Sequence, residues 1–202
     1  MSKAYDRIEW KFLKSMLLSL GFAVKFVDLV MICVTTVRYM VMHDGHEFGP
    51  INPGRGLRQG DPLSPYLFII CAEGLSTILK DYEAKGLIHG CKVAKSAPDV
   101  SHLFFADDNF FFFNATRQEC HKVKEYLNIY EKAFGQIINF QKSSISFSRN
   151  TQNSVKEEIC AYLNVNVTVD HGCYLGLPSL IGKNKKTIFS FVKDKVWRRI
   201  QG

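Results

Sequence analysis

Two adjacent aspartates, Asp107 and Asp108, stand between two of the most apolar stretches of the sequence. Residues 103–105 (Leu-Phe-Phe) precede the pair, and four phenylalanines at 110–113 follow it. An isolated carboxylate buried among such side chains is costly, so a paired acidic turn in this setting suggests a divalent cation held by both carboxylates. An exposed Asp-Asp turn at the tip of a hairpin explains the dipeptide alone equally well.

A second segment that could do chemistry covers residues 58–65, with the sequence Arg-Gln-Gly-Asp-Pro-Leu-Ser-Pro. A flexible glycine here approaches the N-terminus of a helix, where Arg58, Gln59 and backbone N–H groups offer hydrogen-bond donors. Such a site suits a phosphate or a template strand. A capped helix start with a functionless arginine is the alternative, and this segment by itself does not separate the two.

Helices and strands must position these segments. Apolar residues at helical spacing predict helices over residues 8–20, 24–34, 63–82, 116–134, 154–163 and 186–200. β-branched and aromatic runs predict strands over residues 37–42, 102–106, 109–113 and 144–147. Asp44-Gly45 suits a hairpin turn, and Asp61 and Pro62 suit the cap and first turn of the third helix. We therefore expect an α+β domain, with an antiparallel sheet covered by helices.

Length and charge bound the class of protein. At 202 residues and 47% hydrophobic, the chain can bury one substantial core. A net charge of +7 favours polyanionic partners. Basic residues concentrate near the C-terminus, although such a run is often only a solvated face; they are Lys183, Lys185, Lys186, Lys193, Lys195, Arg198 and Arg199, against Asp194.

The cysteines and the apolar runs indicate the compartment. The six cysteines are scattered without a Cys-x-x-Cys pair, which predicts reduced, buried thiols rather than a zinc site. We see no signal peptide, and no apolar run reaches the length of about 18 residues that a membrane span needs. We therefore expect an intracellular protein, in the nucleus or the cytoplasm, with no membrane partner.

In their order and spacing, four segments resemble those of reverse transcriptases from non-LTR (LINE-type) retrotransposons, the plant members most closely. Residues 59–62 resemble palm motif B and residues 105–108 the metal-binding motif C. Residues 135–143 (Gly-Gln-Ile-Ile-Asn-Phe-Gln-Lys-Ser) resemble motif D, and residues 174–178 (Tyr-Leu-Gly-Leu-Pro) the primer-gripping segment. The resemblance covers nearly the whole chain, and four weak motifs in the right order are together specific.

The resemblance implies an RNA-directed DNA polymerase: a truncated palm over residues 1–170, and a primer-grip-like segment with the start of a basic thumb helix over 171–202. On this resemblance we expect the fingers to be missing. The implied cofactors are two Mg²⁺ or Mn²⁺ ions, and the implied partners are an RNA template, a DNA primer and deoxynucleoside triphosphates. Asp107 would be the main catalytic metal ligand, supported by Asp108.

Further roles follow from the same resemblance. Tyr5 falls where the family has the aromatic that blocks a ribose 2′-hydroxyl, and a plain buried aromatic is its alternative. Lys142 would approach the triphosphate, or it is a surface lysine before a strand. The implied nucleotide- or template-binding residues are Tyr5, Arg58, Gln59, Gly60, Phe105, Ala106 and Lys142, and the primer-grip-like residues are Tyr174, Leu175 and Gly176.

At the N-terminus the resemblance breaks. Residues 1–10 resemble motif A, but family members place its metal-binding aspartate immediately before the position of Met1. Asp6 matches a second acidic residue of that motif, with a local capping role. We therefore expect a polymerase-like fold with poor or no activity, and exposed apolar surface where fingers and thumb would pack.

Two other functions are compatible with the sequence. One is a non-catalytic nucleic-acid-binding remnant that uses the basic helix around residues 193–199 and the loop carrying Arg55 and Arg58. The other is an unrelated metal-dependent phosphohydrolase. The six histidines form no obvious ligand set, which disfavours the phosphohydrolase.

Overall fold

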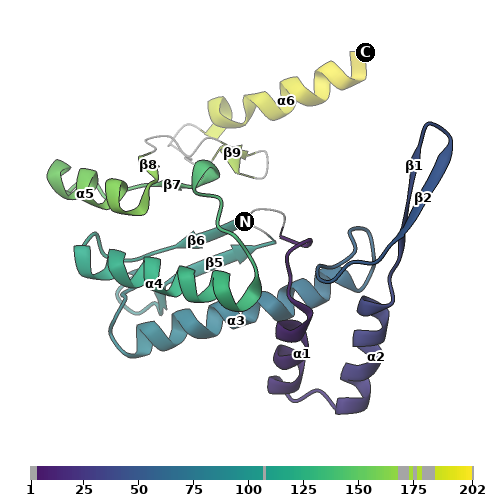
Figure 1. Cartoon of the computed structure of the whole chain (residues 1–202). Coiled ribbons are helices and arrows are strands. Elements are labelled where there is room, and N and C mark those ends of the chain that lie inside the picture. The colour runs from purple at the N-terminus through teal and green to yellow at the C-terminus, as the bar shows by residue number, and fades with distance from the viewer. Residues whose placement is uncertain (1–3, 107, 168–172, 175–176, 179–184, 202) are drawn as a thin grey trace.

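The computed structural model describes residues 4–106, 108–167, 173–174, 177–178 and 185–201 (Figure 1). In this part of the chain the α-helices are α1 (Trp10–Ser19), α2 (Val24–Thr35), α3 (Ser64–Ala84), α4 (Arg117–Phe134), α5 (Asn153–Leu163) and α6 (Lys185–Gln201). The strands are β1 (Tyr39–His43), β2 (His46–Ile51), β3 (Cys91–Lys92), β4 (Asp99–Val100), β5 (His102–Phe105), β6 (Asp108–Phe111), β7 (Ser144–Ile145), β8 (Asn166–Val167), β9 (Cys173–Tyr174) and β10 (Leu177–Pro178). A short 3₁₀ helix covers Phe140–Lys142.

Helix α3 is the scaffold against which the other elements pack. Its apolar face contributes Leu67 and Phe68 to one core, shared with α1 and α2, and Leu75 and Leu79 to a second core, shared with α4. Figure 1 shows α1 and α2 at the N-terminal end of α3, and α4 crossing it further along. One long helix therefore links the segment around Tyr5 to the hairpin that carries the acidic pair.

The start of α3 differs from the sequence-based expectation. The helix begins at Ser64, and Pro65 rather than Pro62 occupies its first turn. Asp61 still caps the approach, because its carboxylate accepts the Leu63 N–H at 2.8 Å. Asp61 and Pro62 thus form a turn that immediately precedes the first turn of α3.

The predicted hairpin around the acidic pair is confirmed as β5 and β6, paired antiparallel. Side chains alternate as the pleat requires: His102 and Phe104 lie on the inner, half-buried face, while Leu103 and Phe105 are exposed. Phe111 of β6 continues the inner face and meets the ring of Tyr126 on α4 edge-on, at a centroid distance of 5.8 Å. This aromatic contact fixes the hairpin on α4.

The expected single antiparallel sheet is not what the described residues form. Their strands pair into five separate two-stranded units, and one of these, β7 with β8, is parallel. Six of the strands are only two residues long, too short to offer a full ladder to a third neighbour. The α+β class is therefore correct, but helices rather than a continuous sheet organise this chain.

The prediction of reduced, buried thiols is confirmed only in part. Five described cysteines are free, but only Cys71 and Cys120 are buried, whereas Cys33 and Cys91 are exposed. Burial raises the pKa of the Cys71 thiol to about 12, and that of Cys120 to about 11. Both side chains therefore remain neutral thiols and serve as core packing. No described helix is long and apolar enough to cross a membrane.

Candidate functional site

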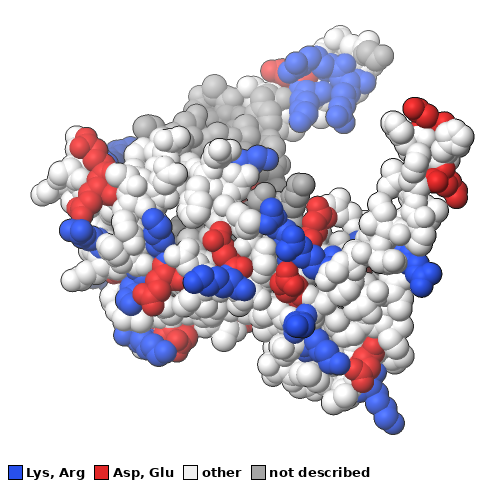
Figure 2. Space-filling view, viewed as in Figure 1, with Lys and Arg blue, Asp and Glu red and all other residues white. Residues whose placement is uncertain are grey.

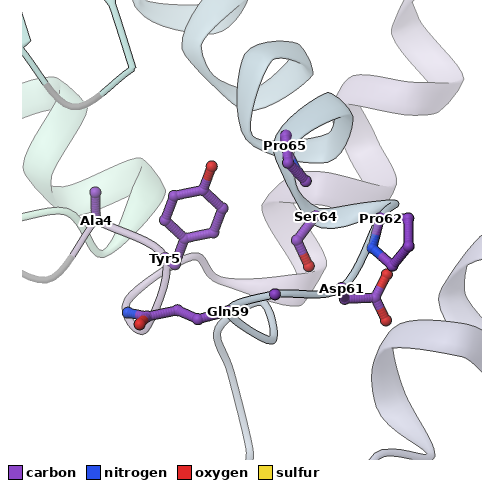
Figure 3. A pocket seen from close by; sticks show the side chains of 8 residues that line it. Ala4, Tyr5, Gln59, Asp61, Pro62, Ser64 and Pro65 are labelled. Carbon is purple, nitrogen blue, oxygen red and sulfur yellow. The ribbon is translucent and has the colours of Figure 1, made fainter.

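A cavity of about 610 Å³ opens between the N-terminal segment and the start of α3 (Figure 3). It is lined by Ala4, Tyr5, Gln59, Gly60, Asp61, Pro62, Ser64 and Pro65. Figure 3 shows Tyr5 and Gln59 arriving from separate stretches of chain, with the Asp61 carboxylate turned away from Tyr5. The structure thus brings together three of the sequence-predicted site residues, Tyr5, Gln59 and Gly60. A volume of this size accommodates a small-molecule ligand.

Tyr5 is held rigidly as one wall of the cavity. Its ring stacks on Phe68 of α3, with the centroids 4.9 Å apart and the planes 18° from parallel. Its backbone carbonyl accepts the Leu57 N–H at 2.8 Å. Because Phe68 lies one helical turn beyond Ser64, the same helix supplies both the floor of the cavity and the support for its aromatic wall.

The loop that carries Gln59 is tied to the N-terminal segment by its backbone. Gly56 donates its N–H to the Ile8 carbonyl at 2.8 Å, and the Trp10 indole donates to the Gly56 carbonyl at 2.7 Å. Gly56 has a φ of 90°, and a Cβ there would lie 2.8 Å from the Asp6 carbonyl oxygen. Only glycine permits this close approach, which sets the position of Gln59.

The cavity carries little charge of its own. Among the lining residues that the structure describes, Asp61 is the one ionisable acid or base apart from the Tyr5 phenol. Arg58, also predicted for this site, is exposed and lines a neighbouring cavity of about 20 Å³ together with Asp61. The larger cavity therefore suits the uncharged parts of a ligand better than a bare phosphate.

Asp108 lies at the turn end of the β5–β6 hairpin, and Asp107 lies outside the described residues. Asp108 pairs with Phe105 across the turn and its side chain is exposed. Ala106 has a φ of 50°, the left-handed conformation that tight turns require. The inference that apolar neighbours bury this carboxylate is therefore wrong for Asp108, because flanking residues alternate between the two faces of the hairpin.

The hairpin is anchored at its other end. His102, at the start of β5, lies 3.0 Å through Nε2 from the Ser76 hydroxyl on α3. In Figure 1 the arrowhead of β5 points toward the N-terminal end of α3 and the N-terminal segment of the chain. The turn that carries Asp108 lies at the end of the hairpin opposite this anchor, where Phe105 pairs with Asp108.

The remaining predicted residues belong to later segments of the chain. Lys142 ends the short 3₁₀ helix, and its side chain is exposed and absent from the cavity lining. Tyr174 belongs to the β9–β10 pair, where it faces Leu177 in register. Leu175 and Gly176 lie outside the described residues. Phe68 and Gln136, which support the cavity, were not predicted as site residues, because helical spacing marks Phe68 only as a core residue and Gln136 was noted only as part of the segment that resembles motif D.

The described side chains form no complete metal site by themselves. They contain no group of three or more His, Cys, Asp or Glu residues placed to share an ion. The exposed carboxylate of Asp108 nevertheless supplies the hard oxygen donors that Mg²⁺ and Mn²⁺ prefer, and Mg²⁺ commonly binds through one or two carboxylates together with waters and substrate phosphates. The donor chemistry at the hairpin fits such an ion.

Comparison with known proteins identifies the family. The model of the reverse transcriptase (RNA-dependent DNA polymerase) family matches residues 1–178. An uncharacterized mitochondrial protein of Arabidopsis thaliana is 49% identical over 65 residues, which cover 32% of this chain and 53% of that protein. The retrovirus-related Pol polyprotein from the type-1 retrotransposable element R2 of Popillia japonica is 30% identical over 107 residues, 52% of this chain and 16% of the polyprotein.

The chain therefore spans about half the length of the first relative and a much smaller part of the second. The family match is far broader, since it covers the segment around Tyr5, the cavity loop, the β5–β6 hairpin and the β9–β10 pair. Taken with the cavity and the hairpin, this match shows that the chain belongs to the reverse transcriptase family.

Proposed function

We propose that residues 1–170 form the palm of an RNA-directed DNA polymerase of the non-LTR retrotransposon type, and that residues 171–202 are its primer-grip-like segment and the start of a basic thumb. The observation that carries this proposal is the cavity in which Tyr5 meets Gln59 and Gly60. These are residues that the family resemblance assigns to the incoming nucleotide and template.

The sugar and base of a deoxynucleoside triphosphate match the character of the cavity. The Tyr5 ring, stacked on Phe68, offers a flat apolar wall. The Gln59 amide offers both a donor and an acceptor at the mouth of the same cavity. Phosphate groups would extend out of the cavity, because the described residues that line it include no cationic side chain. Arg58, exposed beside Gln59, is the nearest cation in the sequence to receive them.

Asp107 and Asp108 would hold the divalent cations, Mg²⁺ or Mn²⁺, at the turn of the β5–β6 hairpin. When bound, such ions activate the primer 3′-hydroxyl and stabilise the leaving pyrophosphate. Asp108 lies at the surface, where a hydrated cation can reach its carboxylate. The hairpin's aromatic inner face and its His102 anchor keep this carboxylate at a fixed place relative to α3.

Primer extension tests the proposal. The family pattern calls for a third carboxylate immediately before Met1, so we compare the 202-residue chain with the same chain carrying an aspartate at that position. We expect weak extension by the first and stronger, Mg²⁺-dependent extension on an RNA template by the second. The double substitution Asp107→Asn and Asp108→Asn should abolish extension and leave primer–template binding intact. Extension by this double variant would refute the assigned roles.

A second function, nucleic-acid binding without catalysis, is favoured by helix α6. Its described basic side chains are all exposed, and Figure 2 shows them gathered on that helix; they are Lys193, Lys195, Arg198 and Arg199. If primer–template binds with a steep salt dependence but no variant extends a primer, this function replaces the first. Replacing these four residues with glutamine should then flatten the salt dependence.

A further inference from the structure

Ala4 and Tyr5, two consecutive residues of the cavity wall, are held through their carbonyl groups by two different parts of the chain. Tyr5 is held by the Leu57 N–H, from the loop that leads to Gln59. Ala4 is held by the side-chain amide of Gln136, which donates from Nε2 to the Ala4 carbonyl. The wall of the cavity thus depends on a residue that lies far along the sequence and outside the cavity lining.

Gln136 is unusual among the buried residues. Only 1% of its surface is exposed, and its Oε1 has no hydrogen-bond partner among the residues that the structure describes. A buried acceptor without a partner destabilises a fold, whereas a methionine would fill the same space without an unmet oxygen. Filling the core therefore does not explain why a glutamine occupies this position. The hydrogen bond that its amide donates to the Ala4 carbonyl is the contact that an apolar residue could not supply.

The backbone before Gln136 holds the same segment. The Phe134 carbonyl at the end of α4 accepts the Glu9 N–H at 3.3 Å. Gly135, at a φ of 71°, approaches so closely that a Cβ there would lie 2.6 Å from the Arg7 carbonyl oxygen. These contacts deliver the Gln136 side chain to Ala4. Residues 134–136 are therefore a clamp on the N-terminal segment, and Gln136 is the part of it that acts next to the cavity.

We infer that Gln136 is a positioning residue for the nucleotide pocket: through Ala4 it fixes the Tyr5 ring against Phe68, so that the pocket wall is set before a nucleotide arrives. This inference rests on the proposed function, because it takes the ligand to be a deoxynucleoside triphosphate. A pocket wall that is already fixed does not have to be ordered during binding, and loosening it weakens binding and relaxes selectivity for the ligand's shape.

The test is equilibrium binding of dATP and of ATP to the full chain, with primer–template and Mg²⁺ present. The variant Gln136→Met keeps the volume and removes the amide. Gln118→Met makes the same change at an exposed position of α4 and is the control. We expect the dissociation constant for dATP to rise about three- to tenfold in the first variant, as loss of one hydrogen bond would give, and to stay within about twofold in the control.

The ratio of the two dissociation constants separates positioning from simple destabilisation. Partial unfolding reduces the active fraction and changes both affinities alike, so the ratio stays constant. A wall that is no longer fixed admits the ribose 2′-hydroxyl more easily, so the ratio of ATP to dATP dissociation constants should fall. If wild type binds and Gln136→Met matches it in affinity and ratio, the inference is overturned while the proposed function stands.

A wild-type measurement covers the case in which the variant does not fold. In the ¹⁵N-labelled chain, we expect the side-chain amide signals of Gln136 to shift on addition of dATP, and those of Gln118 to remain in place. Unshifted Gln136 signals at saturating dATP would overturn the inference. A wild-type chain that binds no nucleotide would overturn the proposed function and this inference together.

Discussion

The imidazole of His102 lies 3.0 Å through Nε2 from the Ser76 hydroxyl, and this contact ties the start of the β5–β6 hairpin to the middle of α3. On the other side of the ring, Nδ1 lies 3.1 Å from the Ser101 hydroxyl, which itself donates to the Glu83 carboxylate at 2.9 Å. Because Ser101 uses its proton on Glu83, its oxygen accepts from Nδ1–H. In the neutral tautomer that carries this proton on Nδ1, Nε2 accepts from the Ser76 hydroxyl.

The substitution His102→Phe should therefore destabilise the chain, and more so at neutral than at acid pH. Burial lowers the pKa of His102, and Lys80 lowers it further, while Glu83 and Glu73 act in the opposite direction. A histidine with a lowered folded-state pKa contributes stability that is fully present above its unfolded value of about 6.5 and is lost as the pH falls below that value.

Urea unfolding at pH 8 and at pH 5.5 measures this effect. Phenylalanine keeps the ring packed on Phe104, whose centroid lies 4.7 Å from that of His102, and removes only the polar contacts. We expect a loss of about 1–3 kcal/mol at pH 8, where buried hydroxyls lose their partner, and a smaller loss at pH 5.5. A loss that is equal at both pH values would show that protonation of His102 plays no part.

Glu119 should be among the most sensitive polar positions in the chain. Its side chain, 6% exposed, accepts from the backbone and ring of His89 at 3.1 and 2.8 Å, and from the backbone and amide of Asn114 at 2.8 and 3.0 Å. Burial raises the pKa of this carboxyl, but these hydrogen bonds outweigh it and hold the pKa below its ordinary value. One carboxylate thus joins the segment after α3 to the end of the hairpin and the start of α4.

We expect Glu119→Gln to cost about 2–4 kcal/mol, because an amide turns one end from acceptor to donor against these N–H groups. The same change at the exposed Glu157 of α5 is the control and should stay within about 0.5 kcal/mol. Thermal or urea unfolding at pH 7 provides both values. The difference in unfolding free energy between wild type and Glu119→Gln should become smaller as the pH falls through the lowered pKa of Glu119. The carboxylate is then protonated in the folded wild type, and its contribution to stability is lost. Similar losses at both positions would contradict the role given to Glu119.

Local sequence signals predicted the bounds of the helices well, but they did not predict which strands pair with each other. Helix α4 begins and ends close to its expected bounds because Thr116 caps the Glu119 N–H and Gly135 supplies a left-handed C-cap. The parallel pairing of β7 with β8 has no such signal, since the strands are two residues long and lie on either side of α5. Short strands carry too little pattern to specify a neighbour.

The candidate site was predicted mainly by resemblance rather than by residue patterns. Nothing near Tyr5 in the sequence indicates that it meets Gln59, because that meeting is created by the Gly56 turn and the Phe68 stack. The contacts of Gln136 and Ser76 were not predicted for the same reason, because both are tertiary contacts; the sequence marked Gln136 only as part of the segment that resembles motif D. Sequence patterns place residues on elements, and packing decides which elements meet.

Gly135→Ala should be more damaging than Gly21→Ala, although both glycines have a positive φ, 71° and 86°. A Cβ at Gly135 would lie 2.6 Å from the Arg7 carbonyl oxygen, whereas a Cβ at Gly21 would meet nothing within 4 Å. Both changes carry the backbone strain of about 1–2 kcal/mol, and the first adds about 1–3 kcal/mol of overpacking. Denaturant midpoints of the two variants measure the difference, and equal midpoints would show that the chain relaxes around Gly135 at no cost.

Tyr5→Ala tests whether the aromatic wall of the cavity selects the ligand. Removing the ring takes away the surface stacked on Phe68 and enlarges the cavity. Under the proposed function, this is the side on which a ribose 2′-hydroxyl would collide. We expect the preference for dATP over ATP in equilibrium binding to fall by at least about tenfold, because steric exclusion of one small group is lost. Tyr5→Phe keeps the ring and should preserve the preference.

Tyr66→Ala is the matched control for this experiment, since Tyr66 lies in the first turn of α3 with 67% of its surface exposed and is absent from the cavity lining. Its loss should leave the preference unchanged. If Tyr5→Ala retains full discrimination, the wall formed by Tyr5 and Phe68 does not face the sugar, and the ligand must enter by the Gln59 side of the cavity. The ratio of the two nucleotide affinities therefore reports the orientation of the bound ligand as well as the role of Tyr5.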